Sequence, residues 1–402
     1  MPRALVLVLA LACGVAVSNV YFPQAITPLI AAGLNVSPGS ATLVATATQL
    51  GYAAGIFLFV PLGDRLRHRP LVVSLLALTG VGLIIASTAR SLPTLVAASV
   101  LVGAATVVPQ ILIPMAATLV GADQRGAVTG TLLSGLLGGI LLARTFSGIL
   151  GQWLGWRAPY LTAATLAAIS AAALVRTLPT TRPPSQQRYL ALLSAAVRLL
   201  RTEPELRRSC LYQATMFAGF TAAWTSLALL VTGPTYHLGT TAVGLIALVG
   251  AGSIFTSPLA GRRVDQSGPG RVNLACFAAA IAAAAILSLA GLGGKLGFVA
   301  LLSGILLLDI AVQCGQVANQ TRIFVLPGDR RSRLNTAYMT CAFLGGTLGS
   351  WLGVHAYLWL AWPGVCGLLA LLALTGLTAH LLTAAASKPA TRTALICPTE
   401  MK

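Results

Sequence analysis

"VPLGDRLRHRP" occupies residues 60–70, and a related stretch, "SPLAGRRVDQSGPGR", occupies residues 257–271. Each stretch follows a long apolar run and combines Pro-Leu, a small-residue turn, an aspartate and several arginines. The two aspartates, Asp64 and Asp265, lie 201 residues apart in a chain of 402. This recurrence predicts an internal repeat of two parallel halves, an organisation found in secondary transporters.

The composition around these stretches is that of a membrane protein. The chain is 56% hydrophobic and 8% charged, with a mean hydropathy of +0.86, whereas soluble proteins carry about 25% charged residues. Helices of about 20 apolar residues cross the hydrocarbon layer. We therefore predict an all-α polytopic membrane protein with twelve transmembrane helices in two pseudo-symmetric six-helix bundles. The spans are expected at about 4–22, 41–62, 71–89, 93–120, 127–149, 157–178, 210–231, 242–260, 272–292, 298–319, 335–358 and 360–384.

A hydrophilic connection separates the two halves. We predict an N-terminal six-helix bundle at 1–178, a cytoplasmic central loop at 179–209, a C-terminal six-helix bundle at 210–386 and a cytoplasmic tail at 387–402. Apolar residues recur at helical spacing within the loop, beside arginines; they are Leu190, Leu193, Val197 and Leu200. This pattern predicts a short helix on the anionic inner leaflet, or alternatively a linker helix without a regulatory role.

The net charge of +18 reports topology rather than nucleic-acid binding. When alternate loops are assigned to the side of the N-terminus, 22 of the 26 Lys and Arg residues fall on that side. The positive-inside rule then places both termini in the cytoplasm. The first apolar run continues past Cys13 to Phe22, which favours an uncleaved first span over a signal peptide. The expected location is the bacterial plasma (inner) membrane.

Several stretches resemble a known family. They are "SNVYFPQAITPLI", "QLGYAAGIFLFVPLGDRL", "SGLLGGILLARTFSG", "GWR" and "NQTRIFVLPGDRRSRLNTAYMTCAFLGGTLGSWLG". Together with the twelve spans and the paired Asp–Arg loops, they are similar to bacterial members of the drug/proton antiporter branch of the major facilitator superfamily. The resemblance covers essentially the whole chain. It implies a secondary active transporter that exports a small organic solute or drug by alternating access, in exchange for protons. The branch includes nucleoside, sugar and chloramphenicol exporters.

The sequence departs from the pattern of that branch in three places. Residues 99–103 read Ser-Val-Leu-Val-Gly in span 4, where the branch has R-x-x-Q-G, so its usual arginine is missing. The first glycine of the loop motif is Val60 in the first half, although Gly261 keeps it in the second. The glycine-rich stretch of span 5 lacks the usual proline. These departures leave an alternative function open: an uncoupled facilitator, or a proton-coupled importer of a sugar, nucleoside or other small metabolite.

The paired loops themselves are predicted to act as conformational latches. Opposite charges at helix ends can pair across helices and interact with helix dipoles. The alternative is a plain solvated positive-inside loop. The residues concerned are Asp64, Arg65 and Arg69 in the first half, and Gly261, Arg262, Asp265 and Arg271 in the second.

Asp309 is the one acidic residue within the predicted spans, and Arg144 is the one clearly embedded basic residue. A charge at such depth costs at least about 2.5–3.5 kcal/mol and normally has a function. Low-dielectric surroundings favour the neutral form of a carboxyl group, so we predict that Asp309 loads and releases protons. Two other interpretations are that Asp309 pairs with Arg144 during the transport cycle, or that it is a static structural contact.

Asp309 also begins a polar stripe. Gln313, Gln316 and Gln320 follow at intervals that place them on one face of span 10. The family resemblance implies that spans 1, 4, 7 and 10 line the central cavity. The candidate solute-binding residues are therefore Gln313 and Gln316; Thr106 and Gln110 in span 4; Asn19, Tyr21 and Gln24 in span 1; Gln49 and Tyr52 in span 2; and Gln213, Phe217, Phe220 and Trp224 in span 7. Ordinary helix packing is the alternative for the span 7 stripe.

No motif supports an enzyme, a channel or an ATP-driven pump. The four histidines are dispersed, the seven cysteines have no metal-ligand spacing, and no phosphate-binding G-x-x-x-x-G-K-S/T occurs. We expect no cofactor and no metal. The expected partners are a small-molecule substrate, protons and membrane lipids, with no nucleic acid, and we expect a monomer.

Overall fold

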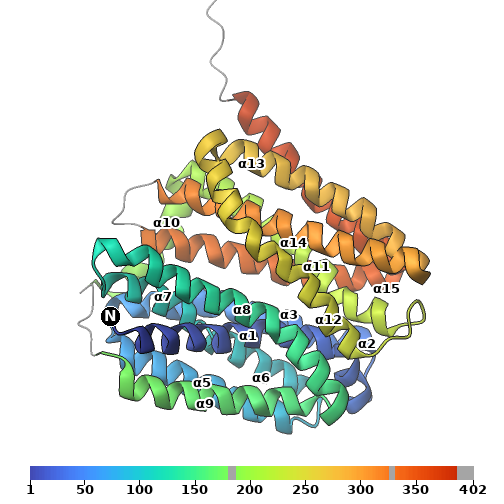
Figure 1. The fold of residues 1–402 in the computed structure, drawn as a ribbon, viewed down its shortest axis with the longest axis horizontal. Coiled ribbons are helices and arrows are strands. Elements are labelled where there is room, and N and C mark those ends of the chain that lie inside the picture. The colour runs from blue at the N-terminus through green and yellow to red at the C-terminus, as the bar shows by residue number, and fades with distance from the viewer. Residues whose placement is uncertain (180–186, 326–330, 387–402) are drawn as a thin grey trace, which may run out of the picture.

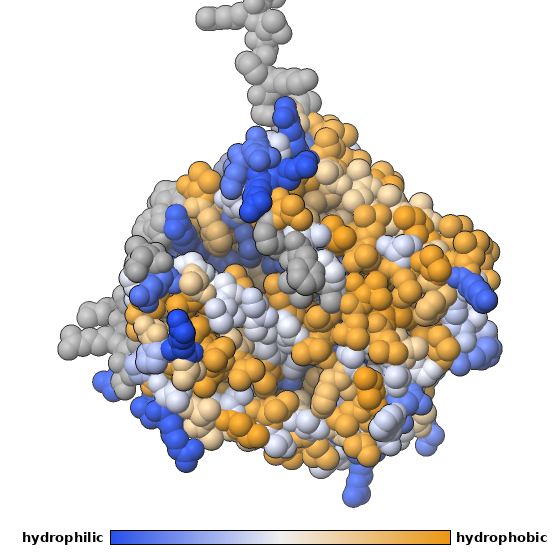
Figure 2. Space-filling model, in the orientation of Figure 1, coloured by the Kyte–Doolittle hydropathy of each residue, from blue (hydrophilic) through white to orange (hydrophobic). Residues whose placement is uncertain are grey.

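The computed structural model describes residues 1–179, 187–325 and 331–386. These three ranges are helical and contain no strand. The helices run side by side in two bundles, with the first half of the chain in one bundle and the second half in the other (Figure 1). Apolar side chains spread over the lateral surface, and strongly hydrophilic ones gather toward its rim (Figure 2). The molecule thus presents the surface that a lipid bilayer requires.

The first bundle contains six spans, two of which are interrupted. Span 2 consists of α2, α3 and α4, and span 4 consists of α6 and α7. The bounds are α1 Arg3–Leu34, α2 Pro38–Ala41, α3 Leu43–Phe59, α4 Leu62–Arg65, α5 His68–Thr88, α6 Leu92–Ala105, α7 Val108–Thr118, α8 Ala122–Leu154 and α9 Arg157–Thr177.

The second bundle follows a linker helix, α10. Its bounds are α10 Tyr189–Thr202, α11 Pro204–Thr232, α12 Thr240–Gly250, η1 Ala251–Thr256, α13 Ser257–Ser288, η2 Leu289–Leu292, α14 Gly294–Phe324 and α15 Arg331–Ala386. α15 has 56 residues and would be about 84 Å long if straight, far longer than a bilayer is thick. It turns back at Ala361 (φ 52°), and α13 turns at Gly268 (φ 81°).

These two turns reconcile the helix count with twelve spans. Among the described residues, ten helices are long and apolar enough to cross a membrane, and Thr240–Gly250 is a shorter apolar helix. The turn at Ala361 makes two spans of α15. α12, η1 and the start of α13 form span 8, and the rest of α13 forms span 9. The predicted fold is therefore confirmed.

Prolines have different effects in two of the predicted spans. Span 1 continues through Pro23 and Pro28 to Leu34 rather than ending near residue 22. The Thr27 hydroxyl donates to the carbonyl oxygens of Pro23 (3.0 Å) and Gln24 (3.4 Å), so the carbonyl that Pro28 leaves unpaired finds a donor. Span 4 breaks at Thr106 and Val107, just before Pro109, which lacks an amide N–H and disfavours helical geometry in the preceding residue.

The two bundles repeat the same packing and meet along two seams. α1 packs on α8 as α11 packs on the first part of α15, and α5 packs on α6 as the second part of α13 packs on α14. The halves meet where α8 contacts α12 and where α3 contacts α15. We call the end of the molecule that holds residue 1, α10 and the start of α15 the α10 end. The other end, where α8 ends and α12 begins, is the distal end.

Candidate functional site

A cavity of about 100 Å³ lies between the two bundles. α1 and α8 line it from the first half, and α11, α12, η1 and α14 line it from the second. Its polar and aromatic lining residues are Tyr21, Arg144, Phe217, Phe220, Ser253, Asp309, Gln313 and Gln316. The structure therefore brings the Asp309 stripe of span 10 and the embedded arginine of span 5 to one cavity.

Asp309 lies near the middle of α14 and is held by its neighbours. The indole Nε1 of Trp224 donates to Asp309 Oδ1 at 3.0 Å. The other oxygen, Oδ2, occupies the space where a side chain at Gly250 would begin. Gly250 thus makes room for the carboxylate, and α11 fixes its orientation through Trp224.

Arg144 is almost fully buried, with 4% of its surface exposed. Its Nε donates to Gln24 Oε1 at 2.8 Å. The guanidinium carbon lies 4.1 Å from the centre of the Trp224 ring, 5.0 Å from that of Tyr21 and 5.7 Å from that of Phe220. These distances allow cation–π attraction, which is stronger away from water. The Nη2 nitrogen is buried without a hydrogen-bond partner.

Asp309 and Arg144 face the same cavity but do not form an ion pair within 4.0 Å in the described part of the chain. Trp224 contacts both, because its N–H bonds Asp309 and its ring lies against Arg144. The direct pair that we considered from the sequence is thus replaced in this structure by a three-residue arrangement centred on an indole.

Aromatic rings form the wall beside these charges. Phe217 and Phe220 stack with ring centres 5.5 Å apart, and Phe220 lies 6.3 Å from Trp224. Phe343 of α15 touches Phe217 edge-on at 5.0 Å and Tyr52 at 4.5 Å. The aromatic part of the predicted span 7 stripe therefore lies at or beside the cavity.

The fourth member of that stripe, Gln213, belongs elsewhere. Its Oε1 accepts from Asn319 Nδ2 at 3.4 Å, nearer the α10 end. Gln213 therefore does not line the cavity.

Seven other predicted residues lie outside the cavity lining; two of them, Gln24 and Trp224, contact Arg144 from behind it, and the other five bond elsewhere or are buried. Asn19 Nδ2 donates to Thr106 Oγ1 at 3.1 Å, and the Thr106 hydroxyl donates to the carbonyl of Ala16, which ties α1 to the break in span 4. Gln110 Nε2 donates to Tyr52 Oη at 3.5 Å. Gln49 is fully buried, and neither atom of its amide has a hydrogen-bond partner.

The two Asp–Arg loops differ in their surroundings. Asp64 Oδ2 accepts from Ser332 Oγ of the second half at 3.4 Å, and Arg69 donates to the carbonyl of Val175. Arg65 is exposed, and so are Arg262, Asp265 and Arg271. Gly261 has open space where a side chain would begin. Within the described ranges, only the first-half loop makes a hydrogen bond to the opposite bundle.

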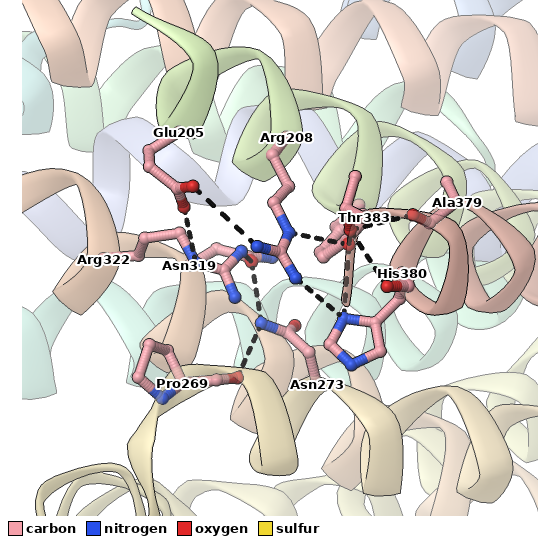
Figure 3. Close-up of polar contacts among 10 residues, drawn as sticks. Glu205, Arg208, Pro269, Asn273, Asn319, Arg322, Ala379, His380 and Thr383 are labelled. Carbon is pink, nitrogen blue, oxygen red and sulfur yellow. Dashed lines mark hydrogen bonds and ion pairs between the residues drawn. The ribbon is translucent and has the colours of Figure 1, made fainter. Parts of the chain in front are cut away.

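A polar network at the α10 end was not predicted from the sequence (Figure 3). Glu205 lies 3.4 Å from Arg322 and 3.8 Å from Arg208. Arg322 Nη1 and Asn273 Nδ2 both donate to Asn319 Oδ1, at 3.5 and 3.0 Å. The network extends through Arg208 and Tyr212 to His380 and Thr383.

The network was not predicted because the expected spans leave Glu205 and Arg322 in loops. α11 begins at Pro204 and α14 continues to Phe324, so both residues are helical, and Arg322 is only 8% exposed. The sequence feature that could have indicated the network is a pair of asparagines within apolar runs, Asn273 and Asn319. Among the described residues, no three His, Cys, Asp or Glu side chains come together as metal ligands would.

Comparisons with known proteins agree with this architecture. The sequence signature of the Major Facilitator Superfamily matches residues 7–350. A putative uncharacterized transporter of Escherichia coli K12, YgaY, is 37% identical over 366 residues, which cover 90% of this chain and 91% of that protein. A probable transporter of Streptomyces coelicolor is 36% identical over 359 residues, which cover 89% of this chain and 82% of that protein. A chloramphenicol resistance protein of Streptomyces lividans is 28% identical over 268 residues, covering 66% and 68%.

Among solved structures, the nucleoside transporter NupG has the same fold, with a TM-score of 0.75 at 13% identity over 96% of this chain and 99% of that chain. The family signature spans most of the sequence, and the relatives that match nearly all of it are transporters. The chain therefore belongs to the Major Facilitator Superfamily and is a multi-pass membrane transporter of small molecules rather than an enzyme.

Proposed function

We propose that the protein is a secondary active exporter, which moves a small organic solute or drug across the membrane by alternating access in exchange for protons. The observation that carries the proposal is Asp309, a carboxylate that faces a cavity between the two halves. A carboxylate in such a place can bind either a proton or a solute, which is the requirement for exchange. The similarity to a chloramphenicol resistance protein supports export of an organic compound.

Protonation of Asp309 would change its local contacts. The ionised carboxylate accepts a charge-assisted hydrogen bond from Trp224 and is attracted by Arg144, whereas the neutral acid keeps a weaker hydrogen bond and loses the attraction of opposite charges. Trp224 also carries the aromatic contact with Arg144. A proton on Asp309 therefore weakens contacts between α8, α11 and α14. Because α8 belongs to the first half and the other two helices to the second, these contacts join the two halves.

The remaining site assignments follow from the same geometry. Tyr21, Phe217, Phe220, Gln313 and Gln316 are our candidates for solute contacts in the cavity. We further propose that both termini are cytoplasmic, that the membrane is the bacterial inner membrane and that the protein is a monomer. The domain bounds given above (1–178, 179–209, 210–386 and 387–402) remain proposals, and the tail lies outside the described residues.

The alternative is an uncoupled facilitator or a proton-coupled importer. It is favoured by span 4, where Ser99 occupies the position of the arginine that is usual in the antiporter branch. Ser99 is buried and donates to the Leu95 carbonyl of its own helix (2.7 Å), so α6 brings no cation to the site. Flux measured in proteoliposomes with and without a pH gradient separates these functions. The proposal expects the solute to accumulate in the more acidic compartment, because it moves opposite to the proton, whereas a proton-coupled importer would accumulate it in the more alkaline one. Flux that never exceeds equilibration would support the facilitator.

A further inference from the structure

The cavity holds one buried cation and one carboxylate that are not paired with each other. Arg144 and Asp309 both line it, and the Trp224 indole holds each of them in place. Unpaired charges in low-dielectric surroundings are costly, and a partner that carries the opposite charges offsets that cost. The geometry therefore points to a solute that brings both an anionic and a cationic group.

The cationic side has a free donor. Arg144 uses Nε on Gln24, whereas Nη2 is buried and has no partner. A guanidinium presents two adjacent N–H groups in the geometry that a carboxylate accepts. A carboxylate on the solute would satisfy this nitrogen, which the protein itself leaves unsatisfied.

The anionic side has free acceptor capacity. An ionised carboxylate has about four lone-pair positions, and one hydrogen bond, from Trp224, is present at Asp309. Asp309 is partly exposed to the cavity, and the amides of Gln313 and Gln316 lie along the same helix face. An ammonium group, with its three donors, fits this set of acceptors.

The rest of the lining limits the body of the solute. Phe217, Phe220, Leu137 and Ile140 give an apolar surface beside the two charges. One water needs about 10–15 Å³ of such volume, so the cavity of about 100 Å³ has room for about seven to ten non-hydrogen atoms. The solute is therefore compact and has a short apolar body.

We propose that the transported solute is a small zwitterion of the amino-acid type, with its ammonium on Asp309, its carboxylate on Arg144 and its side chain against Phe217 and Phe220. This inference rests on the proposed function and names its substrate class. It also explains exchange, because a solute ammonium and a proton compete for the same carboxylate. Export of a neutral zwitterion for one entering proton moves one positive charge inward, so transport responds to membrane potential as well as to pH.

The test is calorimetric titration of the purified full-length protein in detergent, at about pH 7, where the amine probes are still largely protonated, with three probes. They are L-valine, its methyl ester, which lacks the carboxylate, and N-acetyl-L-valine, which lacks the ammonium. We expect valine to bind and each derivative to bind about thirtyfold or more weakly, as when one partner of a buried charge pair is removed. Lowering the pH should weaken valine binding, because protons then occupy Asp309.

Two variants assign the charges. Arg144→Gln should reduce valine binding to the level of the ester, and Asp309→Asn should reduce it to the level of N-acetyl-L-valine. Lys295→Gln removes an exposed positive charge at the start of α14 and should have no effect. Thermal unfolding of each variant, with Arg144→Lys as a second substitution that keeps the charge, shows whether a loss of binding comes from misfolding.

The proposal is overturned if either derivative binds as tightly as valine, or if valine does not bind the folded protein. It is also overturned if folded Arg144→Gln and Asp309→Asn still bind valine more tightly than both derivatives. Binding of valine without any effect of a pH gradient on flux would instead contradict proton coupling and leave the substrate class intact. Gradient-driven flux of a solute that is not a zwitterion, with no valine binding, would contradict only the substrate class.

Discussion

The two seams between the halves occupy equivalent positions but are built differently. At the distal end of the α8–α12 seam, hydroxyl groups bond to backbone: Thr145 donates to the Gly244 carbonyl at 2.8 Å and Thr240 to the Gly148 carbonyl at 3.0 Å. The α3–α15 seam uses side-chain contacts along its length. They include Thr46 with Ser350 (2.7 Å), Tyr52 with Phe343 and Asp64 with Ser332.

The two seams therefore differ in how well each can accommodate an added side chain. Backbone approaches backbone in the α8–α12 seam, so glycine is required there and a new side chain has nowhere to go. Side chains fill the α3–α15 seam, and these can change rotamer. The charged cavity residues Arg144 and Asp309 lie next to the first seam, since Arg144 precedes Thr145 and Asp309 touches Gly250 of α12. The seam with the tighter backbone fit is thus the one that adjoins the proposed proton site.

The largest effect is expected at Gly148. A methyl group there would lie 2.5 Å from the carbonyl oxygen of Thr240, and overpacking of this kind costs about 1–3 kcal/mol. Gly148→Ala should lower the melting temperature and speed amide exchange over residues 240–250. Gly138→Ala is the matched control on the same helix, because it has open space around it. Equal behaviour of the two variants would show that the seam does not depend on this contact.

A single hydrogen bond should also matter more in the α8–α12 seam. Thr145→Val removes the buried donor to Gly244, at a cost of about 0.5–1.5 kcal/mol. Thr46→Val should cost less, because Ser350 keeps a second partner, Thr225, at 3.1 Å. The two unfolding free energies in the same detergent test this order, and a larger loss for Thr46→Val would reverse the comparison.

Gly346→Ala is the corresponding overpacking test in the α3–α15 seam. The new methyl group would lie 2.7 Å from the Phe217 ring and 2.8 Å from Gln49 Oε1, which are side-chain atoms that can move. We expect a loss of about 1 kcal/mol or less, at the low end of the range for overpacking. Gly367→Ala, with open space in the second span of α15 after the turn at Ala361, is the control. Destabilisation equal to that of Gly148→Ala would remove the distinction between backbone and side-chain seams.

The smallest effect is expected at the paired loops. Asp64→Asn weakens an exposed contact with Ser332, worth about a few tenths of a kcal/mol. Asp265→Asn should have no measurable effect, because Asp265 is exposed. The rate of amide exchange over residues 331–340, measured in Asp64→Asn and in Asp265→Asn, compares the two effects. If Asp265→Asn speeds that exchange as much as Asp64→Asn does, the second loop contributes a contact that this structure lacks.

Much of the fold could be predicted because membrane spans are read from local composition. The low charge content, the repeat around Asp64 and Asp265, and the distribution of arginines together predicted two six-helix bundles. Exact bounds depended on local backbone chemistry. In α1 the Thr27 hydroxyl gives a donor to the Gln24 carbonyl that Pro28 leaves unpaired, whereas span 4 breaks before Pro109.

The site was only partly predictable. Helical spacing placed Asp309, Gln313 and Gln316 on one face, and the cost of embedded charge singled out Arg144. The position of Trp224 between the two charges depends on how α8, α11 and α14 pack, which local pattern does not specify. Gln213 shares the spacing of Phe217 but lies in a different environment, because α11 extends beyond the cavity toward the α10 end.

The most direct test of the central claim is gradient-driven flux in proteoliposomes that contain either the wild-type protein or Asp309→Asn. The solute is one selected by thermal-shift screening. The account predicts that a pH gradient drives accumulation by the wild-type protein and that Asp309→Asn, folded to the same extent, shows none. Gradient-driven accumulation by Asp309→Asn at the wild-type rate would contradict the assignment of Asp309 as the proton carrier.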